Sequence, residues 1–251
     1  MSEPYDESRK FIEANGVRFH YALDGNPSKP VLALINMASA NLTTWEPVMD
    51  GLLKHFYVLR FDIRGTGKSA WGADSEFTFS QYADDLAAIM AALDLSRAFV
   101  LGVAYGARAA AQFALRHADK LTALGLFDVA LTPPVEQTGQ KELGLYALQL
   151  LEEAGEPLVV RRKSWLWYEV REAALKAHTA HTREPDITEK LNHINVPVLV
   201  ACGRQDMNLQ EAKRIAAAIP GAEFHVMEMT GHGSPFYRPN LFVCLVSDFV
   251  S

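Results

Sequence analysis

The stretch that decides the fold is Phe99-Val100-Leu101-Gly102-Val103-Ala104-Tyr105-Gly106-Ala107-Arg108-Ala109-Ala110. Its apolar start predicts a buried strand, its two glycines predict a sharp turn, and its small residues predict a helix. This is the setting of a G-x-S-x-G nucleophile elbow, in which a strained turn exposes a serine at its tip. Here the central residue is Ala104, whose methyl group can neither attack a carbonyl nor donate a hydrogen bond. The pattern therefore predicts an elbow that lacks only its reactive atom.

The length and composition indicate an ordinary soluble globular protein. The 251 residues suit one large α/β domain with a small insertion, and 49% of them are hydrophobic. The net charge of −6 argues against nucleic acid or an anionic membrane as a partner, because both attract a basic face. No signal peptide or membrane span is expected. Cys202 and Cys244 are expected to be small core residues, which favours a reducing, cytoplasmic location.

Apolar strands alternate with helices along most of the chain. This rhythm predicts an α/β fold with a mostly parallel central sheet and helices on both faces. Asn15-Gly16 predicts a hairpin between the first two strands, and Ser80 is expected to cap a helix that runs to Leu93. Further strands are expected at 31–35, 58–62, 98–106 (which includes the elbow), 121–127, 196–202 and 223–228.

The rhythm breaks after Pro133-Pro134, and residues 138–184 contain helical patterns without a strand. We therefore expect a helical cap at 132–188 over an α/β core formed by 1–131 and 189–251. Aromatic residues of this cap are candidates for lining a substrate pocket, although such residues equally often pack small helices onto the domain. They are Trp165, Trp167 and Tyr168.

Two loops downstream of the elbow carry the other groups that acyl transfer needs. His232, in the loop after the last strand, is placed to act as a general base. Asp206, directly after the strand 196–202, is placed to fix the tautomer of that histidine and to stabilise its positive charge. Each could instead be an ordinary loop residue, but their order behind the elbow favours the catalytic interpretation. Asp128, at the end of the strand 121–127, is an alternative acid.

Acyl transfer also needs backbone amides that face the developing oxyanion. One is expected from Tyr105, directly after the elbow, and the other from Ala38, with Met37 as the near alternative. An ordinary strand-end turn is the other interpretation of residues 36–39, but their position after the first buried strand favours an oxyanion hole. Pocket-wall residues are expected next to these loops, which suggests a hydrophobic or aromatic substrate. They are Met37, Tyr105, Met207 and Phe236.

These motifs resemble the α/β-hydrolase family over essentially the whole chain. Besides the elbow, the chain has the family's turn Asp62-x-Arg64-Gly65-x-Gly67-x-Ser69, its acid loop Gly203-x-x-Asp206 and its base loop Gly231-His232. Asn36 replaces the histidine that usually begins the oxyanion loop in this fold. The 3-oxoadipate enol-lactonase-like branch has the same asparagine, and residues 34–39 and 59–65 are similar to it. The resemblance implies hydrolysis of a lactone or carboxylic ester without a cofactor.

Three interpretations of Ala104 are open. In the first, the chain is a serine hydrolase whose nucleophile has been replaced, so that it binds its substrate without turnover. In the second, it is a natural, non-catalytic binding protein for small molecules. In the third, it is an oxygenase or lyase that needs only His232 and Asp206. The retained base, acid and oxyanion loop favour the first, because a binding protein has little reason to keep them.

Three other features carry no catalytic prediction. His178 and His181 loosely match metal-ligand spacing with Glu184 and Asp186, but are interpreted as residues of a solvated helix, and no metal is expected. Arg161-Arg162-Lys163 is predicted to be a solvated helix face. Residues 65–69 superficially resemble a phosphate-binding loop but lack its glycine spacing, so nucleotide binding is not expected.

Overall fold

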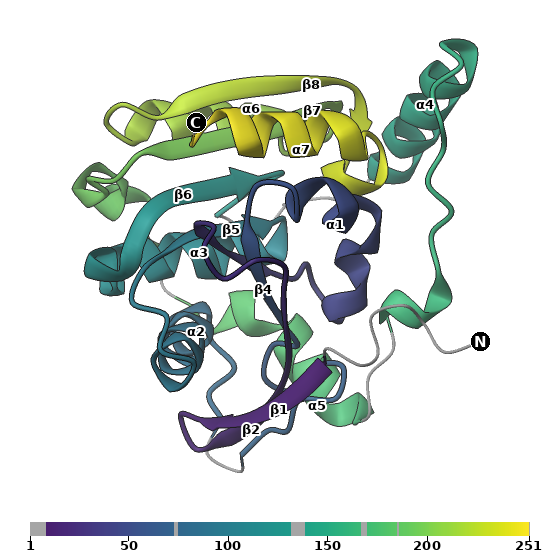
Figure 1. The fold of residues 1–251 in the computed structure, drawn as a ribbon. Helices are drawn as coiled ribbons and strands as arrows, with labels where there is room; N and C mark the ends of the chain where they lie inside the picture. The colour runs from purple at the N-terminus through teal and green to yellow at the C-terminus, as the bar shows by residue number, and fades with distance from the viewer. Residues whose placement is uncertain (1–8, 73–74, 132–138, 167–169, 185, 251) are drawn as a thin grey trace.

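An eight-stranded sheet with the order β1-β2-β4-β3-β5-β6-β7-β8 forms the centre of the computed structural model (Figure 1). The structure describes residues 9–72, 75–131, 139–166, 170–184 and 186–250. The strands are β1 (Arg9–Ala14), β2 (Val17–Asp24), β3 (Val31–Ile35), β4 (Tyr57–Phe61), β5 (Ala98–Val103), β6 (Leu121–Phe127), β7 (Val198–Gln205) and β8 (Glu223–Gly231). The pairs that involve β2 are antiparallel, and all pairs from β4 to β8 are parallel. The predicted fold, including the hairpin at Asn15-Gly16, is confirmed.

Helices cover both faces of this sheet, as predicted. On one face α1 (Glu46–Leu52) and α7 (Pro239–Asp248) pack against it. On the other lie α2 (Phe79–Ala92), α3 (Tyr105–Arg116) and α6 (Leu209–Ala218). Along β5, Phe99 and Leu101 face α1 and α7, while Val100 faces the opposite layer, because successive side chains of a strand point to opposite faces. The central strands β3 and β5 are apolar throughout because both faces of the sheet are buried there.

Two local predictions were wrong. The N-cap of α2 is Thr78, whose side chain accepts a hydrogen bond from the amide of Gln81, whereas the Ser80 hydroxyl donates to Glu184 at 2.6 Å. Cys202 is buried as predicted, but Cys244 is exposed. It lies two residues from the buried Phe242, which places it on the outward side of α7.

The described part of the predicted cap forms two groups of helices that pack in different places. α4 (Gln140–Glu153) lies against β8, where Ala147 and Leu151 join Tyr237 in a small apolar cluster. α5 (Arg171–His178) and the 3-10 helix η5 (Ala180–Thr182) instead join the apolar cluster of α2 and α3. Of the helices in the described ranges, none is long and apolar enough to span a lipid bilayer.

Residues 156–162, between α4 and the 3-10 helix η4 (Lys163–Leu166), form neither a helix nor a strand. Figure 1 shows this stretch running from α4 along the side of the molecule at which β8 ends. The predicted helix face at Arg161-Arg162-Lys163 is therefore wrong over its first two residues. Pro157 lacks an amide donor and Val159 and Val160 are β-branched, and both features disfavour a helix.

Candidate active site

Ala104 lies at the tip of a tight turn between β5 and α3. Its backbone has φ +54° and ψ −110°, a conformation that is strained for a residue with a Cβ atom. A Cβ on Gly102 would lie 2.2 Å from the carbonyl oxygen of Gly106, and a Cβ on Gly106 would lie 2.2 Å from that of Ile35. Positions 102 and 106 must therefore both be glycine, and the turn has the strained geometry of a nucleophile elbow.

The loops after β5, β6, β7 and β8 meet at one edge of the sheet. The amide of Ala104 donates to the carbonyl oxygen of Phe127 at 2.8 Å, and the amide of Asp128 donates to that of Ala201 at 2.8 Å. The parallel pairing of β7 with β8 continues to Gln205 and Gly231. Because parallel strands end on the same side, the residues that follow them gather there.

His232 and Asp206 form a hydrogen-bonded pair at this edge. Nδ1 of His232 lies 2.9 Å from Oδ2 of Asp206, and Oδ1 of Asp206 accepts a hydrogen bond from the amide of Asn208 at 2.9 Å. Asp206 is buried, whereas the side chain of His232 is 37% exposed. With Nδ1 engaged by the carboxylate, Nε2 is the nitrogen that can accept a proton.

The pKa of His232 lies above its ordinary value because opposing effects do not cancel. Burial lowers the pKa, but the hydrogen bond that the ring donates to Asp206 and the charges of Asp206 and Asp128 raise it by more. The charge of Arg161 acts in the opposite direction and lowers the pKa. The carboxylates therefore stabilise the imidazolium form of this side chain.

The predicted oxyanion loop lies against the start of α3. Met37 and Ala38 belong to a turn closed by the amide of Ala40, which donates to the carbonyl oxygen of Met37 at 3.2 Å. The close approach of Gly106 to Ile35 brings this turn beside Tyr105, the first residue of α3. The first amides of a helix have no partner within the helix, so the Tyr105 amide is available to an external acceptor.

Asn36 has a structural role at the base of this loop. Its side chain accepts a hydrogen bond from the indole of Trp45 at 2.7 Å and donates to the carbonyl oxygen of Phe61 at 2.9 Å. The side chain is fully buried, so these bonds fix the path of the chain into the turn that carries Ala38.

Comparison with known proteins agrees with this geometry. Residues 39–243 match the alpha/beta hydrolase family. The chain belongs to this family. RutD of Caulobacter sp. (strain K31), a proposed carbamate hydrolase, is 32% identical over 235 residues, which cover 83% of this chain and 86% of RutD. The N-formylmaleamate deformylase of Pseudomonas putida (strain KT2440) is 25% identical over 95% of both chains. The enol-lactonase of Burkholderia xenovorans LB400 has the same fold, with a TM-score of 0.79, 24% identity and coverage of 96% of this chain and 99% of the lactonase.

In this α/β hydrolase, the side chain of Asp128 binds backbone amides that directly follow His232. Its Oδ2 accepts hydrogen bonds from the amides of Gly233 at 3.1 Å and Ser234 at 2.7 Å, and its Oδ1 accepts one from Gly203 at 3.3 Å. Asp206, by contrast, is the carboxylate bonded to the His232 ring. Burial, together with the charge of Asp206, raises the pKa of Asp128 to about 6. The sequence singled out Asp128 as an alternative acid, but its contacts are those of a clamp between two loops.

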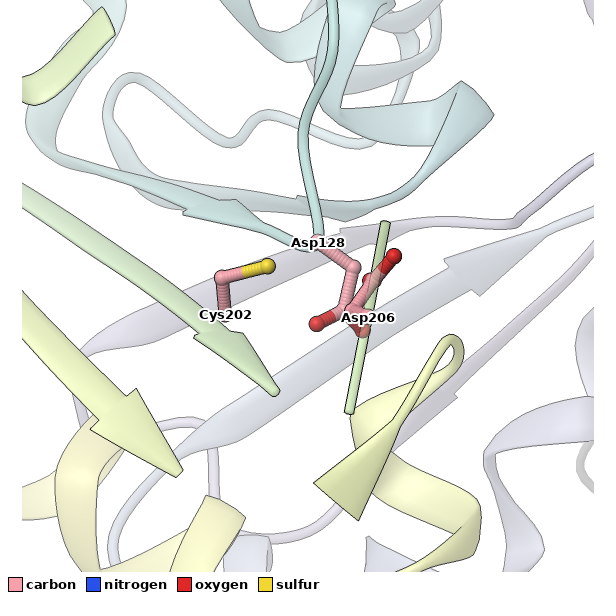
Figure 2. A group of neighbouring side chains, drawn as sticks. All are labelled: Asp128, Cys202 and Asp206. Carbon is pink, nitrogen blue, oxygen red and sulfur yellow. The ribbon is translucent and has the colours of Figure 1, made fainter. Parts of the chain in front are cut away.

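Asp128, Asp206 and the thiol of Cys202 lie together beneath the loops of the hydrolase site (Figure 2). One ligand-type atom from each lies within 4.8 Å of the others, which is a spacing that could suit a metal ion. Burial and the charges of the two aspartates raise the pKa of Cys202, however, so its thiol stays protonated. Both carboxylates are already used for hydrogen bonds to the loops, and we assign this group to loop positioning.

The side chain of Tyr105 joins the elbow of this hydrolase to the predicted cap. Its hydroxyl accepts a hydrogen bond from the amide of Ala180 at 2.9 Å and donates one to the carbonyl oxygen of Ala177. The His178 ring stacks on Tyr105 with a centroid distance of 6.4 Å, and its Nδ1 lies 3.3 Å from the hydroxyl of Ser39 in the oxyanion loop. Sequence reasoning weighed His178 as a metal ligand, interpreted it as a residue of a solvated helix, and missed these contacts.

The predicted pocket-wall residues lie in different surroundings. Trp165 is buried and stacks on Phe236, four residues after His232, with a distance of 5.2 Å between the ring centroids. Met37 packs on the cluster that contains Ala104, and Met207 is 39% exposed. Trp167 and Tyr168 lie outside the described residues. The structure therefore brings Trp165 and Phe236 into direct contact.

Proposed function

We propose that the site of this α/β hydrolase is built for hydrolysis of a lactone or carboxylic ester through an acyl-enzyme, with residue 104 as the nucleophile position. In the chain as it stands, Ala104 leaves a site that binds the substrate but turns it over negligibly. The observation that carries this proposal is the strained turn at Ala104 at the same sheet edge as the His232–Asp206 pair. A strained backbone of this kind is typical of functional sites and costs about 1–3 kcal/mol.

With serine at position 104, the reaction would proceed in two steps. His232 takes the proton of the serine hydroxyl while the oxygen attacks the acyl carbon, and the amides of Tyr105 and Ala38 stabilise the oxyanion. The leaving alcohol then receives the proton from His232. In the second step His232 takes a proton from water and the resulting hydroxide attacks the acyl carbon. The bond between the acyl carbon and the serine oxygen then breaks, the serine oxygen takes the proton back from His232, and the carboxylic acid leaves.

The names of two relatives indicate further types of carbonyl bond that an activity test must include. RutD and the deformylase carry names that refer to a carbamate and a formyl group, and these carbonyls react by the same sequence of addition and elimination. The lactone preference rests on the resemblance of residues 34–39 and 59–65 to the enol-lactonase-like branch. An apolar or aromatic substrate is favoured by Trp165 and Phe236 near the base loop.

Steady-state hydrolysis of a panel of lactones, aryl esters, amides and carbamates tests the proposal. Ala104→Ser is expected to raise kcat by a factor on the order of 10⁶ for a true substrate, because that is the typical effect of a triad nucleophile. Ala104→Gly, which relieves the backbone strain without adding a nucleophile, is the matched control and is expected to stay inactive. If Ala104→Ser hydrolyses no member of the panel faster than Ala104, a natural binding protein or a His/Asp enzyme becomes the better interpretation.

A further inference from the structure

Residues 156–162 form a strap that is fixed to the core near both of its ends. Glu156 pairs with Arg238 at 3.1 Å, and Arg162 pairs with Glu46 at 3.0 Å. Beyond Arg162, the carbonyl oxygen of Ser164 accepts a hydrogen bond from the side-chain amide of Asn41 at 2.7 Å. Arg161, between these anchors, is therefore carried by a segment whose position is defined even though it has no regular secondary structure.

Arg161 lies over two aromatic rings that follow the base loop. Its guanidinium carbon is 4.9 Å from the ring centroid of Phe236 and 5.1 Å from that of Tyr237. Phe236 is itself held by stacking on Trp165, with an interplanar angle of 13°. A cation over aromatic faces is attracted by the ring quadrupoles. The exposed Arg161 side chain is therefore held over two rings that lie four and five residues after His232 in the sequence.

The charge of Arg161 has no partner of opposite sign in the part of the chain that the structure describes. No carboxylate oxygen there lies within 4.0 Å of its guanidinium, whereas the adjacent Arg162 is paired. The charge of Arg161 is also close enough to His232 to affect its pKa. A guanidinium held over aromatic rings can still donate through its N–H groups, whose planar fork matches the two oxygens of a carboxylate.

We propose that Arg161 binds a carboxylate carried by the substrate, so that the substrate class is an ester or lactone with an anionic group as well as an apolar part. This inference rests on the proposed function, since it concerns the ligand of the same site. Trp165 and Phe236 contact the apolar part near the base loop, and Arg161 selects the charged end. A neutral substrate of the same shape loses this contact and binds more weakly.

Calorimetry with a matched pair of ligands tests the assignment on the chain with Ala104, which does not consume them. The probes are mono(4-nitrophenyl) glutarate and its methyl ester, in which the free carboxylate is methylated and so carries no charge. Arg161→Met is expected to weaken binding of the half-ester about tenfold, as is typical for one charged hydrogen-bonded contact, and to leave the methyl ester unchanged. Arg214→Met is the matched control, because Arg214 is exposed on α6 and already paired with Glu211, and is expected to change neither. Arg161→Lys is expected to recover part of the affinity.

Two results would overturn the assignment. One is that the unsubstituted chain binds the half-ester no more tightly than the methyl ester. The other is that Arg161→Met and Arg214→Met weaken binding of the half-ester equally, which would show a general effect of surface charge. Neither measurement requires turnover, so an inactive Ala104→Ser variant would refute the proposed hydrolysis without deciding this result.

Discussion

The ring of His232 is held by Asp206, whereas the backbone beside His232 is held by Asp128. Nδ1 of His232 lies 2.9 Å from Asp206, and the amides of Gly233 and Ser234 donate to Asp128 at 3.1 Å and 2.7 Å. Two buried carboxylates, from the ends of β6 and β7, thus position one histidine. Asp206 fixes its ring and Asp128 fixes the backbone beside it. This division leads to separate predictions for the two aspartates.

Asp206→Asn is expected to lower the pKa of His232. The substitution removes the charge that stabilises the imidazolium and weakens the hydrogen bond to Nδ1, while the burial that lowers the pKa remains. NMR titration of the imidazole signals measures the change. Glu228→Gln, which removes an exposed carboxylate paired with Arg204, is the control and is expected to have no effect on His232. An unchanged titration in Asp206→Asn would show that Asp206 does not set the charge state of the base.

Asp128→Asn is expected to flatten the pH dependence of stability between about pH 4 and pH 6. The pKa of Asp128 is raised from 3.8 to about 6, so over this range the folded state holds a proton that the unfolded state has lost. The free energy of unfolding therefore falls as the pH rises through this window, by up to about 3 kcal/mol from this one group. Urea denaturation at a series of pH values compares the two proteins. If the free energy of unfolding changed with pH in the same way in both proteins, the raised pKa of the buried Asp128 carboxyl would be contradicted.

Tyr105→Phe is expected to loosen η5 and the end of α5 from the elbow. The substitution keeps the ring and the backbone amide but removes the hydroxyl that bonds to Ala177 and Ala180, which costs about 1 kcal/mol per bond. Hydrogen exchange of peptides that cover residues 171–182 is expected to become faster. Tyr146→Phe, at a half-exposed position of α4, serves as the control. Equal exchange in Tyr105→Phe and the unsubstituted chain would show that the hydroxyl does not hold these helices.

Gly106→Ala is expected to destabilise the protein by about 3 kcal/mol or more, because its Cβ would meet two backbone carbonyl oxygens that cannot move independently. Gly72→Ala is the matched control, since the nearest atom to its Cβ would be the Ser75 hydroxyl at 3.8 Å. Urea denaturation measures both variants. A loss at Gly106 no larger than at Gly72 would mean that α3 does not pack closely on Ile35.

The parts of the fold that could be predicted from sequence are those set by local pattern. The alternation of apolar strands and helices fixed the sheet, and Gly102 and Gly106 identified the elbow because their spacing reflects a backbone approach within one turn. The order of Ala104, Asp206 and His232 then placed all three at one edge, since parallel strands end on the same side.

The contacts that sequence could not predict join side chains that are far apart in the chain. The hydroxyl of Tyr105 meets Ala180 across 75 residues, and Asp128 meets Gly233 across 105. Nothing in the local pattern of either residue specifies such a partner. Arg161 was misjudged for a different reason, because three consecutive basic residues favour a solvated helix only where the neighbouring residues allow one.

The most direct test of the central claim is covalent labelling at position 104, because it does not depend on knowing the substrate. A fluorophosphonate loses fluoride to an activated serine and leaves a stable phosphonate ester, whose mass identifies the modified residue. Ala104→Ser is expected to gain one such group at residue 104, whereas the chain with Ala104 gains none and Ala104→Ser combined with His232→Ala reacts far more slowly. Labelling of Ala104→Ser that is absent, or that does not depend on His232, would contradict the assignment of this turn as a nucleophile elbow served by His232 and Asp206.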